Sequence, residues 1–197
     1  MGPVAIDPST RGSPPIAAPA ERPVTGLQLD EVYRAELGFV WRSAKRLGVR
    51  EAALDDVVQE VFVIVHRRLG DFEGRSALRT WLFGITLRVV RDHKRSVARK
   101  SPDAAVDPDT LRATSAGPSE SMEKKEAVRL LHAILDEMDD ERREVFVMAE
   151  LEQMSMPDIA GALGVNVNTA YARLRAARQT FESALARSRA RDEWRLR

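Results

Sequence analysis

Residues 154–181 read MSMPDIAGALGVNVNTAYARLRAARQTF, and the spacing of their side chains predicts two short helices joined by a tight turn. Ser155 and Asp158 have the spacing of a capping box at the start of the first helix, and Gly164 supplies the left-handed residue that ends it. Asn166 caps the second helix. That helix carries an apolar stripe at spacings of three and four, formed by Val167, Ala170, Leu174, Ala177 and Phe181. This is the helix-turn-helix pattern, in which the second helix enters the major groove of duplex DNA.

The side of the second helix that faces away from the stripe, with its flanks, holds the candidate DNA contacts. They are Asn168, Thr169, Tyr171, Ala172, Arg173, Arg175 and Arg178. Arginine either reads guanine edges bidentately or only holds phosphates, and the spacing leaves both roles open. An ordinary helix pair with a solvated basic face is the alternative. The absence of a carboxylate on this helix before Glu182 favours DNA binding.

The overall charge of the chain gives no sign of a nucleic-acid partner, because 31 Lys and Arg face 30 Asp and Glu in 197 residues. The charges are segregated locally, with basic clusters at 75–100 and 173–191 and an acid-rich stretch at 103–158. The lack of cysteine excludes disulfides, thiolate chemistry and Cys-ligated zinc. No apolar run reaches membrane-spanning length and no secretory signal is visible, so we expect a soluble cytoplasmic protein without membrane insertion.

Proline placement divides the chain and predicts an all-α protein of two small helical domains joined by a flexible linker, the second ending in the helix-turn-helix. No strand alternation or internal repeat is visible. The predicted parts are a disordered Pro-rich tail at 1–26, a first domain at 27–100, a linker at 101–124, a second domain at 125–187 and a basic tail at 188–197. We expect the basic tail mostly to fray.

The predicted helix at about 51–69 has one apolar face and one acidic face. The acidic face carries Asp55, Asp56, Gln59 and Glu60 near the helix N-terminus. These acids either complement the helix dipole or dock a basic partner, and their spacing does not separate the two roles.

A Gly-flanked loop at 70–75 and the basic helix after it are the second candidate site. Trp81 lies on the apolar stripe of that helix and is expected in the core, whereas Phe83 lies off the stripe beside several cations. Exposed aromatic rings next to cations suit a single strand, whose bases stack while its phosphates pair. The alternative is that Phe83 is also core and the arginines are only solvated. For Phe72, in the loop, we favour a functional role.

Two long segments resemble a known family. DDVVQEVFVIVHRRLGDFEGRSALRTWLFGITLRVVRDHKR, from Asp55, looks like region 2 of the extracytoplasmic-function sigma factors of bacterial RNA polymerase. LDEMDDERREVFVMAELEQMSMPDIAGALGVNVNTAYARLRAAR, from Leu135, looks like their region 4. The two segments occur in the right order with a suitable linker between them, and no region 3 is evident. The resemblance covers about 29–186.

The resemblance implies that the chain directs core RNA polymerase to specific promoters and assists promoter melting. Contacts with the polymerase clamp helices would come from Asp55, Asp56, Gln59 and Glu60. Contacts with the minus-ten element would come from Phe72, Glu73, Arg75, Ser76, Thr80, Phe83, Arg88, Arg91 and Lys94. Contacts with the minus-thirty-five element would come from Asn168, Thr169, Tyr171, Ala172, Arg173, Arg175 and Arg178, while the same domain meets the polymerase flap.

The resemblance also implies an anti-sigma factor as a partner. Two other functions stay open from the residues alone. A helix-turn-helix regulator that binds duplex DNA without polymerase would not need the basic, aromatic-bearing helix of the first domain. An enzyme is disfavoured because the three histidines, His66, His93 and His132, are far apart in the sequence, and neither a phosphate-binding glycine loop nor a nucleophile motif is present. We therefore expect no catalytic residue, metal or cofactor.

Overall fold

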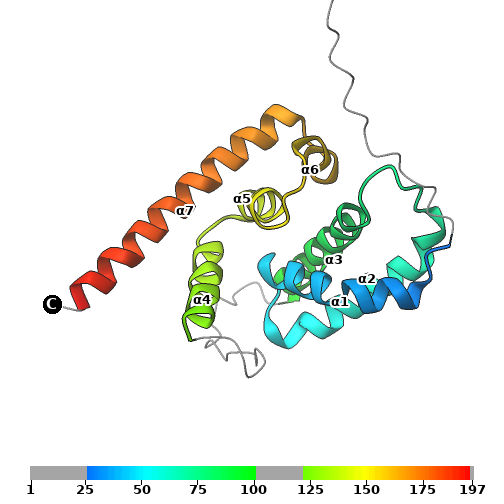
Figure 1. Ribbon diagram of the computed structural model, residues 1–197, viewed down its shortest axis with the longest axis horizontal. Coiled ribbons are helices and arrows are strands. Elements are labelled where there is room, and N and C mark those ends of the chain that lie inside the picture. The colour runs from blue at the N-terminus through cyan, green and yellow to red at the C-terminus, as the bar shows by residue number, and fades with distance from the viewer. Residues whose placement is uncertain (1–25, 101–121, 196–197) are drawn as a thin grey trace, which may run out of the picture.

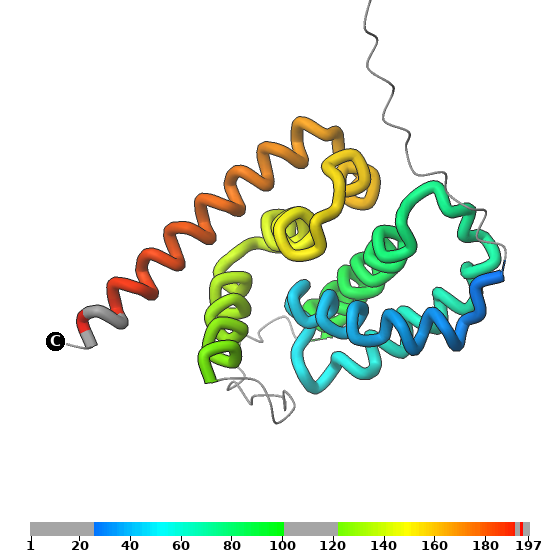
Figure 2. The backbone as a smooth tube through the Cα atoms, viewed as in Figure 1, coloured from blue at the N-terminus to red at the C-terminus, as the bar shows by residue number. Residues whose placement is uncertain are grey.

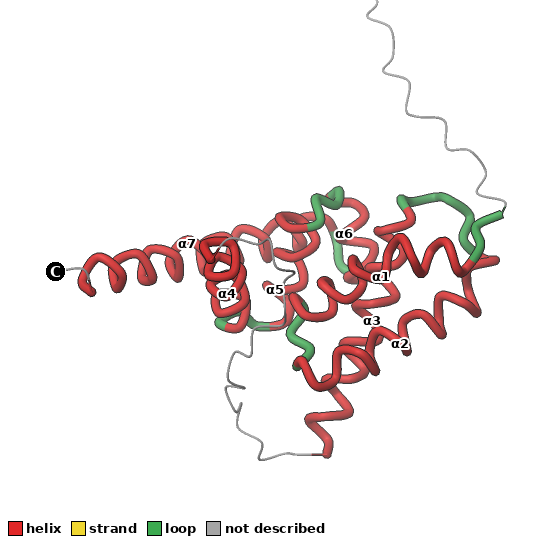
Figure 3. The backbone as a smooth tube through the Cα atoms, turned by 60° about the horizontal axis from the view of Figure 1, so that its bottom comes forward, coloured by secondary structure: helices red, strands yellow, loops and turns green. Residues whose placement is uncertain are grey.

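A computed structural model describes residues 26–100 and 122–195 of the chain (Figure 1). These residues form helices, turns and loops, and no strand occurs among them, as Figure 3 shows. The predicted all-α class is therefore confirmed. Residues 1–25 of the predicted tail at 1–26 and residues 101–121 of the predicted linker at 101–124 lie outside the described residues. None of the described helices has the length and apolar character needed to cross a membrane.

The first half of the chain is a three-helix unit. Its elements are α1 (Leu29–Arg46), α2 (Glu51–Arg68), a short 3-10 turn η1 (Leu69–Asp71) and α3 (Leu78–Lys100). The three helices pack on one another, and α3 contacts both α1 and α2. Because α3 has helices on two sides, it buries a wide arc of its surface, including Leu82, Phe83, Ile85, Leu87 and Val89.

The second half contains four helices and one π-helical turn. Its elements are α4 (Met122–Asp136), α5 (Asp140–Phe146), the π turn η2 (Val147–Leu151), α6 (Met156–Leu163) and α7 (Val167–Arg195). The long helix α7 packs against α4, α5 and α6, and its C-terminal end projects away from the other helices (Figure 2). The core of this half is built around Ile134, Val145, Met148, Ile159 and Leu174, all almost fully buried.

The two halves meet mainly where α5 approaches α3 and the turn after α1 (Figure 1). That turn contains Gly48 at φ +93°, and a Cβ built there would lie 2.0 Å from Nη1 of Arg143 in α5. The guanidinium of Arg143 is held in place because its Nε donates to the carbonyl of Leu135 at 2.8 Å and its Nη2 lies 3.2 Å from Asp136 Oδ1. Gly48 therefore ends α1 and also lets the two halves come close together.

Two helices extend past the boundaries that the sequence predicts. Helix α4 begins at Met122, inside the segment 101–124 that was expected to be linker. Helix α7 continues to Arg195, although the basic tail at 188–197 was expected mostly to fray. The alternation of arginine with small residues along Arg187–Ala190 is compatible with a helix, since both arginine and alanine have high helix propensity.

Candidate nucleic-acid interface

The helix-turn-helix forms with the predicted caps. The Ser155 hydroxyl accepts from the backbone N–H of Asp158 at 3.3 Å and donates to its carboxylate at 2.7 Å. Gly164 has the expected left-handed conformation, at φ +69°. Oδ1 of Asn166 accepts from the backbone N–H of Thr169 at 2.7 Å and so caps α7. These contacts fix where α6 ends and where α7 begins.

The predicted apolar stripe of α7 is confirmed except at its first residue. Ala170, Leu174 and Ala177 are buried, and the Phe181 ring stacks on Phe146 with 4.9 Å between centroids. Val167 is 38% exposed, so its predicted burial is wrong. It is the first residue of α7, at the end of the helix, where fewer neighbours cover a side chain.

The three arginines of the predicted recognition surface differ in their partners. Arg173 is half-buried and pairs with Glu141 at 2.8 Å, and Arg178 pairs with Glu150 at 2.7 Å. Arg175 is exposed and makes no ion pair with any residue that the structure describes. The other candidates on this surface are exposed, except the half-buried Thr169; the exposed ones are Asn168, Tyr171 and Ala172. Arg175 is therefore the one of these three arginines whose guanidinium has no ion-pair partner among the described residues.

The acidic face of α2 is open to solvent. Its four candidate residues are all exposed and lie opposite the buried residues of the same helix; they are Asp55, Asp56, Gln59 and Glu60. None of its three carboxylates forms an ion pair within the described part of the chain. Unneutralised carboxylates on one helix face are suited to a basic partner.

The loop between η1 and α3 brings two aromatic rings together. Phe72 and Trp81 are both half-buried, and their ring centroids lie 5.2 Å apart. The prediction that Trp81 belongs to the core is correct in part, because its ring packs against the core but is not covered completely. Glu73 and Arg75 are exposed and pair at 2.7 Å, and Ser76 is half-buried.

Phe83 is a correction to the sequence analysis. Its side chain is fully buried, at 0% exposure, and its ring centroid lies 6.5 Å from that of Phe39 in α1. A side chain covered in this way cannot stack on a DNA base, so the expectation of an exposed aromatic at this position is wrong. The cause is that α3 packs on two helices rather than one, which a single predicted stripe does not include.

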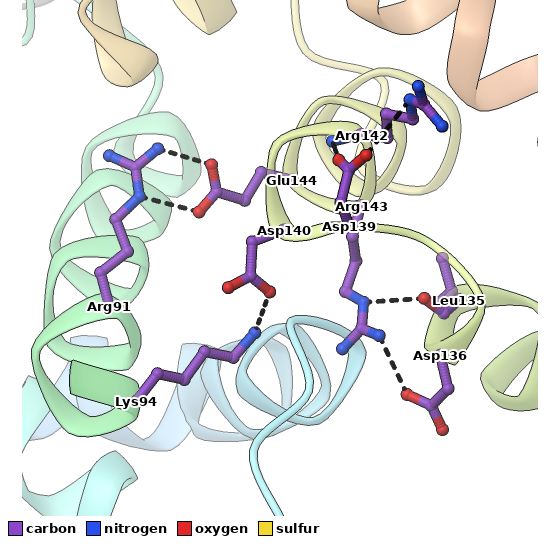
Figure 4. Close-up of polar contacts among 9 residues, drawn as sticks. All are labelled: Arg91, Lys94, Leu135, Asp136, Asp139, Asp140, Arg142, Arg143 and Glu144. Atoms are coloured by element: carbon purple, nitrogen blue, oxygen red, sulfur yellow. Dashed lines mark hydrogen bonds and ion pairs between the residues drawn. The ribbon is translucent and has the colours of Figure 1, made fainter. Parts of the chain in front are cut away.

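The basic face of α3 is partly occupied by the second half of the chain (Figure 4). Arg91 donates to both carboxylate oxygens of Glu144 in α5, at 2.7 and 2.5 Å, and Lys94 lies 2.5 Å from Asp140. The hydrogen bonds from Arg91 to Glu144 raise the pKa of the guanidinium above its usual value. Arg88 on the same helix is exposed, and Thr80 is half-buried.

A groove of about 1380 Å³ between α1, α2 and α4 was missed by the sequence reasoning. Its apolar lining includes Tyr33, Trp41, Val63 and Val128, three of which are more than 40% exposed. The sequence signal was present in Val63 and Val128, which are apolar residues outside the predicted stripes. The approach of α4 to α1 could not be predicted, because these helices belong to different halves of the chain.

Comparison with known proteins identifies both halves. The sigma-70 region 2 family matches residues 32–100, and the sigma-70 region 4 family matches residues 129–181. The RNA polymerase sigma-H factor of Pseudomonas aeruginosa is 30% identical over 138 residues, which cover 66% of this chain and 72% of that protein. The ECF RNA polymerase sigma factor SigE of Mycolicibacterium smegmatis is 30% identical over 164 residues, covering 80% of this chain and 62% of that protein.

A solved structure has the same two-domain fold. The sigma factor RpoE of Bartonella quintana, in complex with the anti-sigma factor NepR, superposes with a TM-score of 0.65 at 20% identity and covers 80% of this chain and 96% of that one. The two family matches and the curated relatives show that the chain is a promoter-directing subunit of RNA polymerase. The chain belongs to the extracytoplasmic-function group of the sigma-70 family of RNA polymerase sigma factors.

Proposed function

We propose that the chain uses its two halves for two different forms of promoter DNA, the first for an unpaired strand and the second for duplex. The observation that carries this proposal is the presence of exposed cations on two separate helices, with Arg88 exposed on α3 and Arg175 exposed on α7. A regulator that binds only duplex DNA needs the cation on α7 but not the one on α3. Catalysis of RNA synthesis belongs to the polymerase, with which the chain acts in the cytoplasm.

In the first half, the loop and α3 would hold the melted minus-ten element. Removing a base from the stack costs a few kcal/mol, so melting needs a receiving site and cations beside the freed strand. The half-buried ring of Phe72 and the Glu73–Arg75 pair offer such a site in the loop. The proposed contacts are Phe72, Glu73, Arg75, Ser76, Thr80, Arg88, Arg91 and Lys94.

In the second half, α7 would read the minus-thirty-five element in the major groove. The proposed contacts are Asn168, Thr169, Tyr171, Ala172, Arg173, Arg175 and Arg178. Ala172 offers no hydrogen-bonding group to a base edge, so base readout would depend on Asn168, Arg175 and their neighbours.

Two protein partners follow from the same arrangement. The open carboxylates of α2 would dock the clamp helices of core polymerase, and the second half would meet the flap. An anti-sigma factor would cover these polymerase-binding faces, as the family resemblance implies; the Bartonella quintana sigma factor was solved with such a protein.

Run-off transcription with purified core polymerase tests this function. We expect the chain to co-purify with core enzyme and to direct transcripts from discrete start sites selected from genomic DNA. The double substitution Asp56→Gln and Glu60→Lys should weaken binding to core polymerase, because two carboxylates of the α2 face are lost. A chain that shifts duplex DNA but never joins the polymerase would instead support the duplex-only regulator.

A further inference from the structure

Three exposed residues form a stripe along the outer face of α7. Asn168, Ala172 and Arg175 are spaced by four and three residues, so the helical repeat places them one above the other. Ala170 and Leu174, which are buried, lie on the opposite side of the same helix. A molecule that contacts the outer face of α7 therefore meets the three side chains of the stripe together.

The two polar members of the stripe are not engaged within the described part of the chain. There the side chain of Asn168 makes no hydrogen bond, and Arg175 makes no ion pair. Their neighbours differ, because the carboxamide of Asn166 caps α7 and the guanidinium of Arg178 is held by Glu150. The carboxamide and the guanidinium of the stripe thus keep their donors and acceptors for a ligand.

Ala172 leaves a hollow in the middle of the stripe. A cavity of about 530 Å³ opens on the outer face of α7, and its lining includes Tyr171, Ala172 and Arg175. Tyr171 is 55% exposed, so its ring supplies a second apolar surface beside the alanine methyl group. Among the four standard bases, only thymine displays a methyl group in the major groove. The hollow is therefore suited to a thymine.

The stripe has the length of a short base sequence. Seven residues separate Asn168 from Arg175, which is about 10.5 Å along a helix that rises 1.5 Å per residue. Successive base pairs of DNA lie about 3.4 Å apart, so the stripe spans about four base pairs. Asparagine pairs bidentately with adenine, arginine pairs bidentately with guanine, and alanine contacts the thymine methyl group. The order of these side chains therefore corresponds to an order of bases.

We propose that Asn168, Ala172 and Arg175 read, in this order, an adenine, the methyl group of a thymine and a guanine within about four base pairs of duplex DNA. This inference rests on the proposed function, in which α7 enters the major groove, and it adds the base order to that function. Arg173 and Arg178, which carboxylates of the same half hold, would add affinity for the DNA backbone rather than base preference.

Selection from random duplexes tests the base order. The full chain, reconstituted with core polymerase, should enrich duplexes with adenine, thymine and guanine at fixed positions within about four base pairs. Each variant should lose the preference at one position only: Asn168→Ala at the adenine, Ala172→Gly at the thymine and Arg175→Lys at the guanine. Lysine keeps the positive charge but lacks the planar fork of arginine, so Arg175→Lys separates base reading from attraction to phosphates.

A base analogue isolates the methyl contact. Uracil in place of the thymine removes only the methyl group, and it should weaken binding of the wild type by about fourfold, the effect of exposing one buried methyl-sized group. For Ala172→Gly, the thymine and uracil duplexes should bind within about 1.5-fold of each other. Each ratio compares two duplexes on one protein, so it is unaffected if a variant is partly unfolded.

Ala186→Gly is the matched control for Ala172→Gly. Ala186 is also exposed on α7, and the substitution costs the same helix propensity. It lies about 21 Å from Ala172 along the helix, which is beyond the stripe. The control should therefore keep the difference between thymine and uracil that the wild type shows.

A uracil effect that persists in Ala172→Gly, or one that is absent in the wild type, would overturn the reading of thymine. Equal loss of preference at all three positions in any one variant would assign the stripe to backbone contacts and would overturn the base order. Failure of the chain to join core polymerase would contradict the proposed function instead. The same selection with the full chain alone would then still test the base order, because α7 needs only duplex DNA for it.

Discussion

The substitution Phe83→Ala decides whether this aromatic ring serves the fold or the DNA. Phe83 is 0% exposed between α3 and α1, and its ring lies 6.5 Å from Phe39. Truncating a fully buried phenylalanine costs about 3–5 kcal/mol of unfolding free energy, through lost burial and the cavity left behind. The lost ring pair adds to the burial term, so we expect about 4 kcal/mol.

That loss is large for a unit of this size. Single domains unfold with about 5–15 kcal/mol, and small ones lie near the lower end. With an m-value of about 2 kcal/mol per M in urea, the midpoint of the first half should fall by about 2 M. Urea unfolding of the full chain at 25 °C, followed by circular dichroism, measures this shift. The second half should keep its own midpoint, which makes it an internal reference.

Phe72→Ala is the matched comparison, because Phe72 is half-buried in the loop and contacts Trp81. It should lower stability by only about 1 kcal/mol and should mainly reduce open-complex formation. If Phe83→Ala left the midpoint within about 0.5 M of the wild type while promoter melting failed, Phe83 would act on DNA and the reasoning from burial would be wrong.

Three further outcomes are expected. Ser155→Ala should lower stability by about 1 kcal/mol through loss of the α6 cap, whereas Ser183→Ala on the exposed side of α7 should be nearly neutral in the same thermal melt. Burial, followed by the positive charge of Lys45, lowers the pKa of His132 below its usual 6.5, so the unfolded chain binds more protons as pH falls. Stability should therefore decline below about pH 6.5, and His132→Gln should flatten the decline between pH 7 and 5 in urea titrations. Arg175→Ala should cost about 1–3 kcal/mol in promoter binding and relax one base preference; an equal loss on all sequences in a binding-selection assay would make Arg175 a phosphate contact.

The helix-turn-helix could be predicted almost completely because its signals are local. Ser155, Gly164 and Asn166 act on backbone groups within three or four residues, so their roles can be seen without the rest of the fold. The exposed acids of α2 were also predicted from local signals, because the helical repeat places them on the face opposite the buried residues.

The sequence reasoning was wrong or silent wherever distant segments decide the outcome. Phe83 is buried by a second neighbouring helix, and no spacing within α3 shows that helix. Glu144 is 53 residues away from Arg91, and no local pattern links the two. From the sequence, Arg91 was therefore either a contact with the unpaired DNA strand or a solvated cation, whereas in the structure a carboxylate of the other half holds it.

Gly48 links the backbone conformation of the turn after α1 to the distance between the two halves. A methyl group there would collide with the guanidinium of Arg143, which two contacts hold in place, and it would also strain a residue at φ +93°. A larger residue at this position would push the two halves of the chain apart. A screen that measures only protein abundance would then score substitutions at position 48 as folding defects. Part of their effect would instead be a change in how closely the two halves pack.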